Sequence, residues 1–373
     1  MRPLGASLRE EIQAHGAITF RDFMERALYD PEYGFYSAAR ARIGRAGDFF
    51  TNVSVGPLFG TLLARQFAEV WERLDRPAEF TIVEQGAHAG DFARDTLAAL
   101  RRLAPGCAEA AKYVIIEPAP QLRALQEANL GKERVRWVRS LTELPPFAGV
   151  HFSNELLDAF PTHLVRWDGA HWGEQYVALN GSEFVFACGP LSRDALRDRL
   201  DRFRDFRAGY TTEVNLAAIQ WASDVAGKLQ KGVVLAIDYG FARPEFYAPE
   251  RTAGTLRAYR AHRLEENPLA TPGEIDLTAH VEFTSVAEAA EAAGLSVHGF
   301  TDQHHFFVAL GAMHFPEGVV PSPGEMREFK TLMHPTMLGR SFQVLALARG
   351  LIGAPLSGFS LAGDAGRALA MNR

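Results

Sequence analysis

From Phe80 onward, short runs rich in β-branched residues alternate with longer helical stretches, and this alternation constrains the fold more than any other feature. The runs expected to form strands are 80–85, 113–117, 135–138, 149–153 and 232–239. Strands separated by helices at this spacing are typical of a parallel sheet with helices on both faces. We therefore expect an α/β fold whose ligand site lies at the carboxyl ends of the strands.

Two additions to this sheet are expected. Residues 1–75 are predicted to form an N-terminal helical cap with a lid loop, and short helices are expected at 8–15 and 19–28. Residues 76–373 are predicted to form the sheet domain. An α+β subdomain is inserted into it at 160–230, because this segment is too long for a simple loop.

The insert begins with a strand meander and is expected to continue with helices at 193–206 and 212–230. Two later apolar runs, 296–301 and 305–310, are joined by a short turn. We expect these runs to close the sheet as an antiparallel edge.

Composition narrows the class of protein. The 373 residues are 47% hydrophobic and 23% charged, as in ordinary globular proteins. The net charge of −6 and the lack of a dense basic block argue against a nucleic-acid partner or an anionic membrane surface. Two cysteines, no apolar run of membrane-spanning length and acidic residues at Glu10 and Glu11 favour a cytoplasmic protein.

The first run leads into a glycine turn, Glu84-Gln85-Gly86-Ala87-His88-Ala89-Gly90, followed by a helix from about Asp91. Such a turn lets backbone amides approach a ligand at a helix N-terminus, although a plain tight turn is the alternative. Its spacing matches neither the dinucleotide fingerprint nor the phosphate loop. A methyltransferase loop has no pyrophosphate to hold, and Glu84 can face the ammonium group of S-adenosylmethionine.

An acid also ends the second run. Glu117 stands where a carboxylate can accept hydrogen bonds from both ribose hydroxyls, in methyltransferases and NAD enzymes alike. It therefore indicates a ribose without choosing the cofactor, and a helix cap is the alternative. Leu141, after the run 135–138, is counted with the cofactor-binding residues.

Polar residues cluster where the fourth run ends. Asn154, Glu155 and Asp158 are the candidate catalytic residues, because carboxylates there can hold a guanidinium group and orient one of its nitrogens. If a helix turn begins at Glu155, the three-residue spacing puts both carboxylates on one side. Local capping of turns is the alternative role.

Five further residues are assigned to ligands. Asp48, Phe50 and Thr51 lie on a loop that can fold over the cofactor, although aromatic residues there can also fix the helices to the sheet. Tyr239, after the fifth run, is expected to line the substrate channel. His280 is either a base near the substrate or a buried, hydrogen-bonded residue. No histidine pair has metalloenzyme spacing and no cysteine supports one, so no metal site is predicted.

Seven ordered segments along nearly the whole chain match one known family. They are PEYGFYS at 31–37, GDFFT at 47–51 with Phe59-Gly60, the glycine loop, SNELLDAFP at 153–161, IDYG at 237–240, GTLR at 254–257 with His262, and DLTAHV at 276–281. These segments resemble the MidA family, which includes the mitochondrial complex I assembly-factor methyltransferases. The resemblance implies a Rossmann-like class I methyltransferase fold and S-adenosylmethionine as the methyl donor. In the mitochondrial branch it implies protein arginine methylation.

The chain departs from the family pattern at two informative places. His88 stands where the middle glycine of Glu-x-Gly-x-Gly-x-Gly belongs, and Glu282 replaces an aspartate. A histidine adds bulk beside the methionine moiety, where it can hydrogen bond the cofactor's carboxylate or obstruct binding. A non-glycine residue also restricts the backbone angle at this position.

Three functions remain open from the sequence. The first is methyl transfer to a protein side chain, most plausibly an arginine; the second is methylation of a small-molecule oxygen or nitrogen. The third is a catalytically silent assembly factor that binds a partner protein, for which the altered loop at His88 is the best argument. A homodimer is left open.

Overall fold

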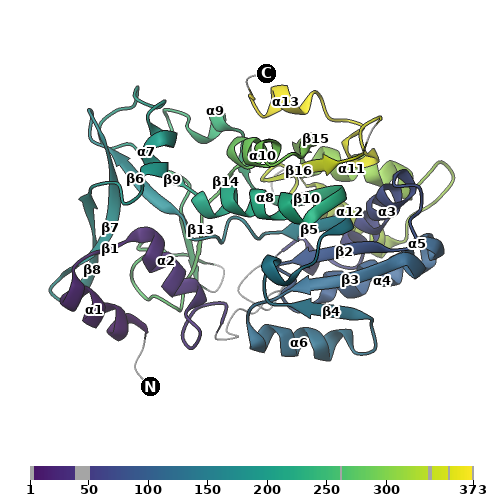
Figure 1. Cartoon of the computed structure of the whole chain (residues 1–373), viewed down its shortest axis with the longest axis horizontal. Helices are drawn as coiled ribbons and strands as arrows, with labels where there is room; N and C mark the ends of the chain where they lie inside the picture. Colours follow the sequence, from purple (N-terminus) through teal and green to yellow (C-terminus); the bar gives the residue numbers. More distant parts are fainter. Residues whose placement is uncertain (1–3, 38–50, 261–262, 335–337, 352, 372–373) are drawn as a thin grey trace. The chain divides into compact units, whose positions relative to one another are not determined.

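The computed structural model describes residues 4–37, 51–260, 263–334, 338–351 and 353–371. These residues belong to two compact units, shown with their elements in Figure 1. Unit 1 comprises residues 1–49, 157–218 and 244–281, and unit 2 comprises 50–156, 219–243 and 282–373.

Unit 2 contains the central sheet. Its elements are η1 (Val53–Val55), α3 (Leu58–Arg73), β2 (Phe80–Gln85), α4 (Asp91–Leu103), α5 (Pro105–Ala110), β3 (Ala111–Ile116), α6 (Pro120–Leu130), β4 (Val135–Val138), η2 (Leu141–Glu143), β5 (Phe147–Asn154), β10 (Leu229–Phe241), α10 (Phe283–Ala292), β15 (Ser296–Asp302), α11 (Gln303–His314), α12 (Pro323–Met333), β16 (Phe342–Arg349), η4 (Ser357–Phe359) and α13 (Ala365–Ala368). Three elements, α8 (Leu216–Lys228), α9 (Arg243–Phe246) and β14 (Val281–Glu282), lie at the boundaries between the units.

The strands of this sheet follow the order β15-β16-β10-β5-β2-β3-β4. The strands β10, β5, β2, β3 and β4 run parallel to one another, with Gln85 beside Ser153 and Ile116. The expected parallel α/β sheet is therefore confirmed. All five runs predicted to be strands lie in it.

The antiparallel edge differs from the prediction. β16 pairs antiparallel with both β10 and β15, so the run 296–301 is a strand as expected. The prediction of a strand at 305–310 is wrong, because these residues lie within helix α11. The Asp302 side chain accepts a hydrogen bond from the backbone N–H of His305 and so caps this helix.

Successive residues of β5 pack against different layers. The Phe152 ring stacks on Phe92 of α4 with centroids 4.3 Å apart and meets Phe67 of α3 edge-on. His151, the preceding residue, points to the other face and meets Trp221 of α8 edge-on at 5.5 Å. Helices therefore cover both faces of the sheet, as Figure 1 shows.

Unit 1 has two smaller antiparallel sheets. Its elements are α1 (Leu4–His15), β1 (Ile18–Thr19), α2 (Phe20–Tyr29), β6 (His163–Trp167), β7 (Trp172–Asn180), β8 (Glu183–Gly189), α7 (Asp194–Leu200), β9 (Thr211–Val214), β11 (Arg257–Arg260), β12 (Arg263–Leu264) and β13 (Asp276–Thr278). The first sheet has the order β1-β7-β6-β9, with β8 paired to β7, and the second has the order β12-β11-β13. Thr19 caps α2 as expected, and Phe20, Phe23 and Met24 are buried in the unit's core.

Several family segments meet inside unit 1. The Tyr36 hydroxyl donates to the Asp276 carboxylate at 2.7 Å. Glu213 of β9 is buried and accepts hydrogen bonds from the backbone N–H groups of Thr255 and Leu256. The motif segments at 31–37, 254–257 and 276–281 thus have structural roles in this unit.

The unit boundaries can be compared with the predicted segments. The predicted cap (1–75) and insert (160–230) contribute most of unit 1, whereas α3 packs in the core of unit 2. The helix predicted at 212–230 begins later, at Leu216, because residues 211–214 form β9. The helix predicted at 193–206 is the shorter α7. The domain boundaries themselves stay a prediction.

Candidate functional site

The glycine loop between β2 and α4 has an unusual backbone. Gly86, His88 and Gly90 all have positive φ values, at +86°, +42° and +84°. These are the three positions at which the Glu-x-Gly-x-Gly-x-Gly pattern places glycine. The loop therefore keeps the glycine-type conformation although a histidine occupies its middle position.

The left-handed conformation has a cost at His88. A residue with a Cβ loses about 1–2 kcal/mol there, although histidine tolerates it better than most residues do. The α4 helix begins at Asp91, directly after the loop, so unpaired backbone N–H groups of its first turn lie beside the loop. This arrangement suits a polar ligand at the carboxyl edge of the sheet.

Glu84 lies at the end of β2 and is buried. Its carboxylate accepts a hydrogen bond from the Tyr113 hydroxyl at 2.6 Å. Burial raises the pKa of Glu84 to about 8, against the lowering effect of the Tyr113 hydrogen bond; the charge of Asp91 raises it further. The group can therefore change its charge near neutral pH when a cation approaches.

Glu117 lies directly after β3 and is also buried. One carboxylate oxygen accepts from the Ala119 backbone N–H and the other from Gln126 Nε2, both at 2.9 Å. Burial raises the pKa of Glu117, while these two hydrogen bonds lower it. Each carboxylate oxygen can accept a second hydrogen bond, so the group can still bind a ribose diol. The helix-cap role and the ribose role are thus compatible.

The residues at the tip of β5 lie against the glycine loop. A Cβ placed on Gly86 would come 3.9 Å from the Asn154 carbonyl oxygen. The Asn154 side chain donates to Glu155 Oε1 at 2.8 Å, and Glu155 has a φ of +52°. The structure therefore brings Asn154 and Glu155 together beside the loop.

Sequence reasoning missed Asn52 as part of this group. Its backbone N–H donates to Glu155 Oε1 at 3.3 Å, and its side chain donates to Asn154 Oδ1 and Gln303 Oε1, both at 2.9 Å. Asn52 and Gln303 are completely buried. No local signal marks an asparagine for such contacts, because its partners lie far away in the sequence.

The expected helix turn at Glu155 is absent. Residues 155–160 form bends and turns, so helical spacing does not place Glu155 and Asp158 on one side. The reason is the left-handed backbone at Glu155, which ends the strand without starting a helix. Asp158 belongs to unit 1, where its carbonyl accepts from the Ala279 N–H.

His280 also belongs to unit 1. Its backbone N–H donates to the Thr255 hydroxyl at 3.0 Å. Burial, with the charges of Arg257 and Arg251, lowers the pKa of His280 to about 4, so its ring is neutral at pH 7. Its role toward a substrate stays a prediction.

The remaining predicted residues are placed as follows. Tyr239 is half-buried, and its ring meets Phe342 at 3.9 Å between centroids. The Thr51 hydroxyl accepts from the Ser54 N–H at 3.3 Å just before η1, and Leu141 is the first residue of η2. Asp48 and Phe50 lie outside the described residues, as does His262.

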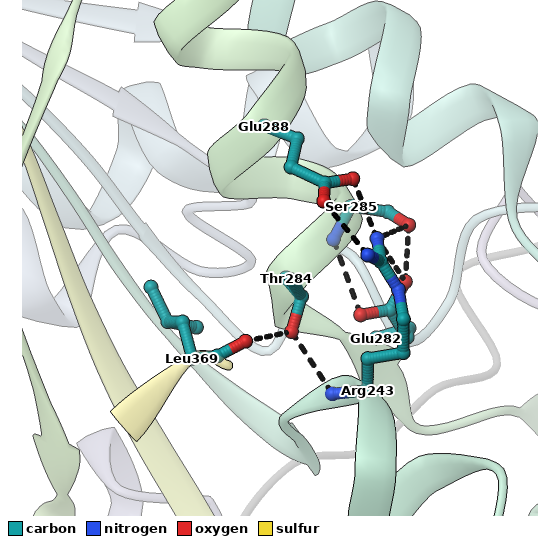
Figure 2. A network of polar contacts seen from close by, with 6 residues as sticks. All are labelled: Arg243, Glu282, Thr284, Ser285, Glu288 and Leu369. Carbon is teal, nitrogen blue, oxygen red and sulfur yellow. Dashed lines mark hydrogen bonds and ion pairs between the residues drawn. The ribbon is translucent and has the colours of Figure 1, made fainter. Parts of the chain in front are cut away.

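Glu282, the second departure from the family pattern, has a structural role in unit 2. It caps α10 by accepting from the Ser285 N–H, and its carboxylate lies 3.6 Å from the Arg243 guanidinium. Figure 2 shows that this guanidinium also pairs with Glu288, at 2.7 and 2.5 Å. The Thr284 hydroxyl accepts from the Arg243 N–H and donates to the Leu369 carbonyl. The network fixes the start of α10.

In the part of the chain that the structure describes, no three histidine, cysteine, aspartate or glutamate side chains come together in a way that could hold a metal ion.

Comparison with known proteins decides the family. Residues 62–301, more than half of the chain, match the model of a family of S-adenosyl-L-methionine-dependent methyltransferases. The chain belongs to this family. Its membership makes the protein a methyltransferase with S-adenosylmethionine as its cofactor, as the loop and the MidA resemblance indicated.

Solved structures agree with this assignment. A Burkholderia thailandensis protein bound to S-adenosyl-homocysteine is 35% identical, with a TM-score of 0.87 over 96% of this chain and 94% of that chain. A native crystal structure from the same organism is also 35% identical, with a TM-score of 0.84 and the same coverage. The Rossmann-like methyltransferase fold is therefore confirmed.

Curated relatives are more distant in sequence. The Drosophila melanogaster protein arginine methyltransferase NDUFAF7 homolog, mitochondrial, is 26% identical over 96% of this chain and 88% of its own length. The human protein arginine methyltransferase NDUFAF7, mitochondrial, is 25% identical over 92% and 83%. Since both names include a mitochondrial location, the cytoplasmic expectation stays a prediction. Within the described residues, no helix is long and apolar enough to cross a membrane.

Proposed function

We propose that this methyltransferase acts on an arginine side chain of a protein. The observation that carries the proposal is the Asn154 and Glu155 pair, which lies beside Gly86 at the carboxyl edge of the parallel sheet. A carboxylate at this place suits a cationic acceptor. The names of the curated relatives support the same acceptor.

We also propose which residues hold the cofactor. Gly86, His88 and Gly90 would lie along the methionine moiety, Glu84 would face its ammonium group and Glu117 would bind the ribose. The left-handed loop, the start of α4 and the two buried carboxylates fit a ligand with a cation at one end and a diol at the other.

S-adenosylmethionine supplies a methyl group activated by a positively charged sulfur. The residues of the chain must then hold the acceptor in line and remove its proton. Glu155 would accept hydrogen bonds from the guanidinium and take the proton that leaves the attacking nitrogen. Asn154 and Asn52, which donate to Glu155 Oε1, would keep that carboxylate in one orientation.

Methylation of matched peptides tests the acceptor. The protein is incubated with tritiated S-adenosylmethionine and arginine peptides, and with the same peptides carrying lysine instead. We expect label on the arginine peptides alone, located by mass spectrometry. Equal labelling of the lysine peptides would contradict the arginine acceptor. No labelling together with intact cofactor binding would favour the silent assembly factor.

Substitution of the two acids separates their roles. Glu155→Gln should lower turnover by about 100-fold or more, the usual loss for a general base, while affinity for S-adenosylhomocysteine changes less than about twofold. Glu117→Ala should instead weaken that affinity, measured by calorimetry. Glu109→Gln, an exposed acid on α5, is the matched control. An unchanged affinity of the Glu117 variant would remove that residue from the site.

A further inference from the structure

Two amide side chains on one face of α6 hold the backbone of the glycine loop. Gln126 Nε2 donates to the His88 carbonyl at 2.9 Å. Asn129 Nδ2 donates to the Ala89 carbonyl at 3.0 Å. Because positions three apart share a helix face, one side of α6 donates hydrogen bonds to two successive carbonyls of the loop.

Gln126 also contacts Glu117, the acid proposed to bind the ribose. The same Nε2 donates to Glu117 Oε2 at 2.9 Å, and Gln126 Oε1 accepts from Trp137 Nε1 at 2.9 Å. An indole N–H can only donate, so Trp137 decides which end of the amide faces the loop. Gln126 is completely buried, which makes this arrangement costly to change.

The residue held by Gln126 is the strained one. His88 has a φ of +42°, which is a rare conformation for a residue with a Cβ. Such conformations persist only where the surroundings fix them. The hydrogen bond from Gln126 falls on the carbonyl of this same residue, so it can supply that constraint.

We propose that Gln126, assisted by Asn129, is a positioning residue that holds His88 in the left-handed conformation and aligns Glu117 at the same time. One buried amide thereby connects the loop for the methionine moiety to the acid for the ribose. It explains how a loop with histidine at a glycine position keeps a geometry that admits the cofactor. The inference rests on the proposed cofactor residues.

A double-mutant cycle with His88 tests the inference. Affinity for S-adenosylhomocysteine is measured by calorimetry in the wild type, Gln126→Met, His88→Gly and the double variant. Methionine keeps the length of glutamine and loses its donors. We expect Gln126→Met to weaken binding about tenfold in the His88 background and about threefold or less beside glycine, which adopts positive φ freely. Gln121→Met, an exposed glutamine of the same helix, should change nothing.

A second variant covers the case in which Gln126→Met fails to fold. Asn129→Ala removes an exposed donor, and its smaller loss of affinity should also shrink in the His88→Gly background. Equal losses in both backgrounds, or no loss, would overturn the inference, since a merely structural amide would not be rescued by glycine.

The cofactor assignment fails in a different way. If Glu117→Ala bound S-adenosylhomocysteine as tightly as the wild type, the assignment of the site would be wrong. The coupling between Gln126 and His88 would then still be measured in the melting temperature of the ligand-free variants. If the two substitutions are coupled in melting temperature, Gln126 holds His88 in the left-handed conformation. If their effects on the melting temperature are additive, the inference is overturned.

Discussion

The side-chain amides of Asn52 and Gln303 hydrogen bond to each other in both directions, at 2.9 and 2.8 Å, although 251 positions separate them. Both side chains are completely buried. Gln303 Nε2 also donates to the Leu332 carbonyl, and Asn52 donates to Asn154. The pair therefore ties the start of α11 to the proposed catalytic residues at the tip of β5.

Breaking this pair should destabilise unit 2. Leucine is similar in size to asparagine, but Asn52→Leu leaves the buried partners of Asn52 without hydrogen bonds. We therefore expect it to lower the free energy of unfolding by about 3 kcal/mol. Gln303→Met should do the same. The double variant should lose less than the sum of the two, because the mutual hydrogen bonds between Asn52 and Gln303 are lost only once and neither amide of the pair is left facing an apolar replacement. Urea denaturation of the three variants measures this, and additive losses would contradict a direct coupling.

Cofactor binding should depend on pH if Glu84 faces the ammonium group, as we propose. Burial raises the pKa of Glu84 to about 8, so the ligand-free protein holds a proton there at pH 7. An ammonium group beside it favours the charged form, so binding of S-adenosylhomocysteine should release a proton and strengthen from pH 6.5 to about pH 8. Calorimetry in buffers of different ionisation enthalpy measures that proton. Glu84→Gln should bind more weakly and release none.

The same group has a separate effect on stability. Because the pKa of Glu84 is higher in the folded chain than its ordinary value of 4.5, the folded state binds more protons between about pH 4.5 and 8. Stability contributed by Glu84 therefore declines as the pH rises through this window, by up to about 1.4 kcal/mol per pH unit. Glu84→Gln should remove this decline in urea denaturation. A decline unchanged in the variant would assign it to other groups.

His151 should make the stability of unit 2 sensitive to acid. It belongs to β5, the strand between β2 and β10, and its ring is completely buried against Trp221; neither ring nitrogen has a hydrogen-bond partner among the described residues. Burial lowers the pKa of His151 to about 3. Below about pH 6.5 the His151 ring is protonated in the unfolded chain but stays neutral in the folded chain. The free energy of unfolding therefore falls as the pH falls toward 3.

Replacing His151 with phenylalanine tests this effect. His151→Phe keeps a ring against Trp221 and removes two unpaired polar atoms, so stability at pH 7 should be kept or increased. The acid-induced loss should be smaller by up to about 1.4 kcal/mol per pH unit below pH 6. The measurement is urea denaturation at pH 7 and pH 5. The same loss in both proteins would show that His151 is not responsible.

The sequence predicted the parallel sheet and the position of its ligand edge because both depend on local patterns. Runs such as 80–85 are short, β-branched and bounded by helices, and parallel strands bring their carboxyl ends together. For that reason the sequence alone places Gly86 and Asn154 at one edge of the sheet. The run 305–310 failed because a short apolar run suits a strand and a buried helix equally well.

The residues that support the site could not be predicted in this way. Gln126 and Gln303 are glutamines at helical positions, and their sequence neighbours do not reveal whether they face water or a buried carbonyl. Their importance follows from partners that only the tertiary structure brings near. The positive φ of His88 also could not be inferred from the sequence. Its place in the glycine pattern indicated only that the backbone there is constrained.

The end of β16 offers the last prediction, on how two helices are anchored to the sheet. The Arg349 guanidinium donates to four backbone carbonyls. They are Ala226 and Leu229 at 2.9 and 2.7 Å, and Ala293 and Gly294 at 2.7 and 3.2 Å. These carbonyls lie at the carboxyl ends of α8 and α10, where a positive charge is favourable.

Removing this guanidinium should loosen both helix ends. We expect Arg349→Met to lower the free energy of unfolding by about 2–3 kcal/mol, since four carbonyls lose a charged donor that is partly shielded from water. Arg349→Lys should recover less than half of this loss, because one ammonium cannot reach four carbonyls in the planar arrangement of a guanidinium. Arg136→Met, an exposed arginine on β4, is the control and should change stability by less than about 0.5 kcal/mol. If lysine restored full stability, the positive charge alone would explain the anchor and its geometry would not matter.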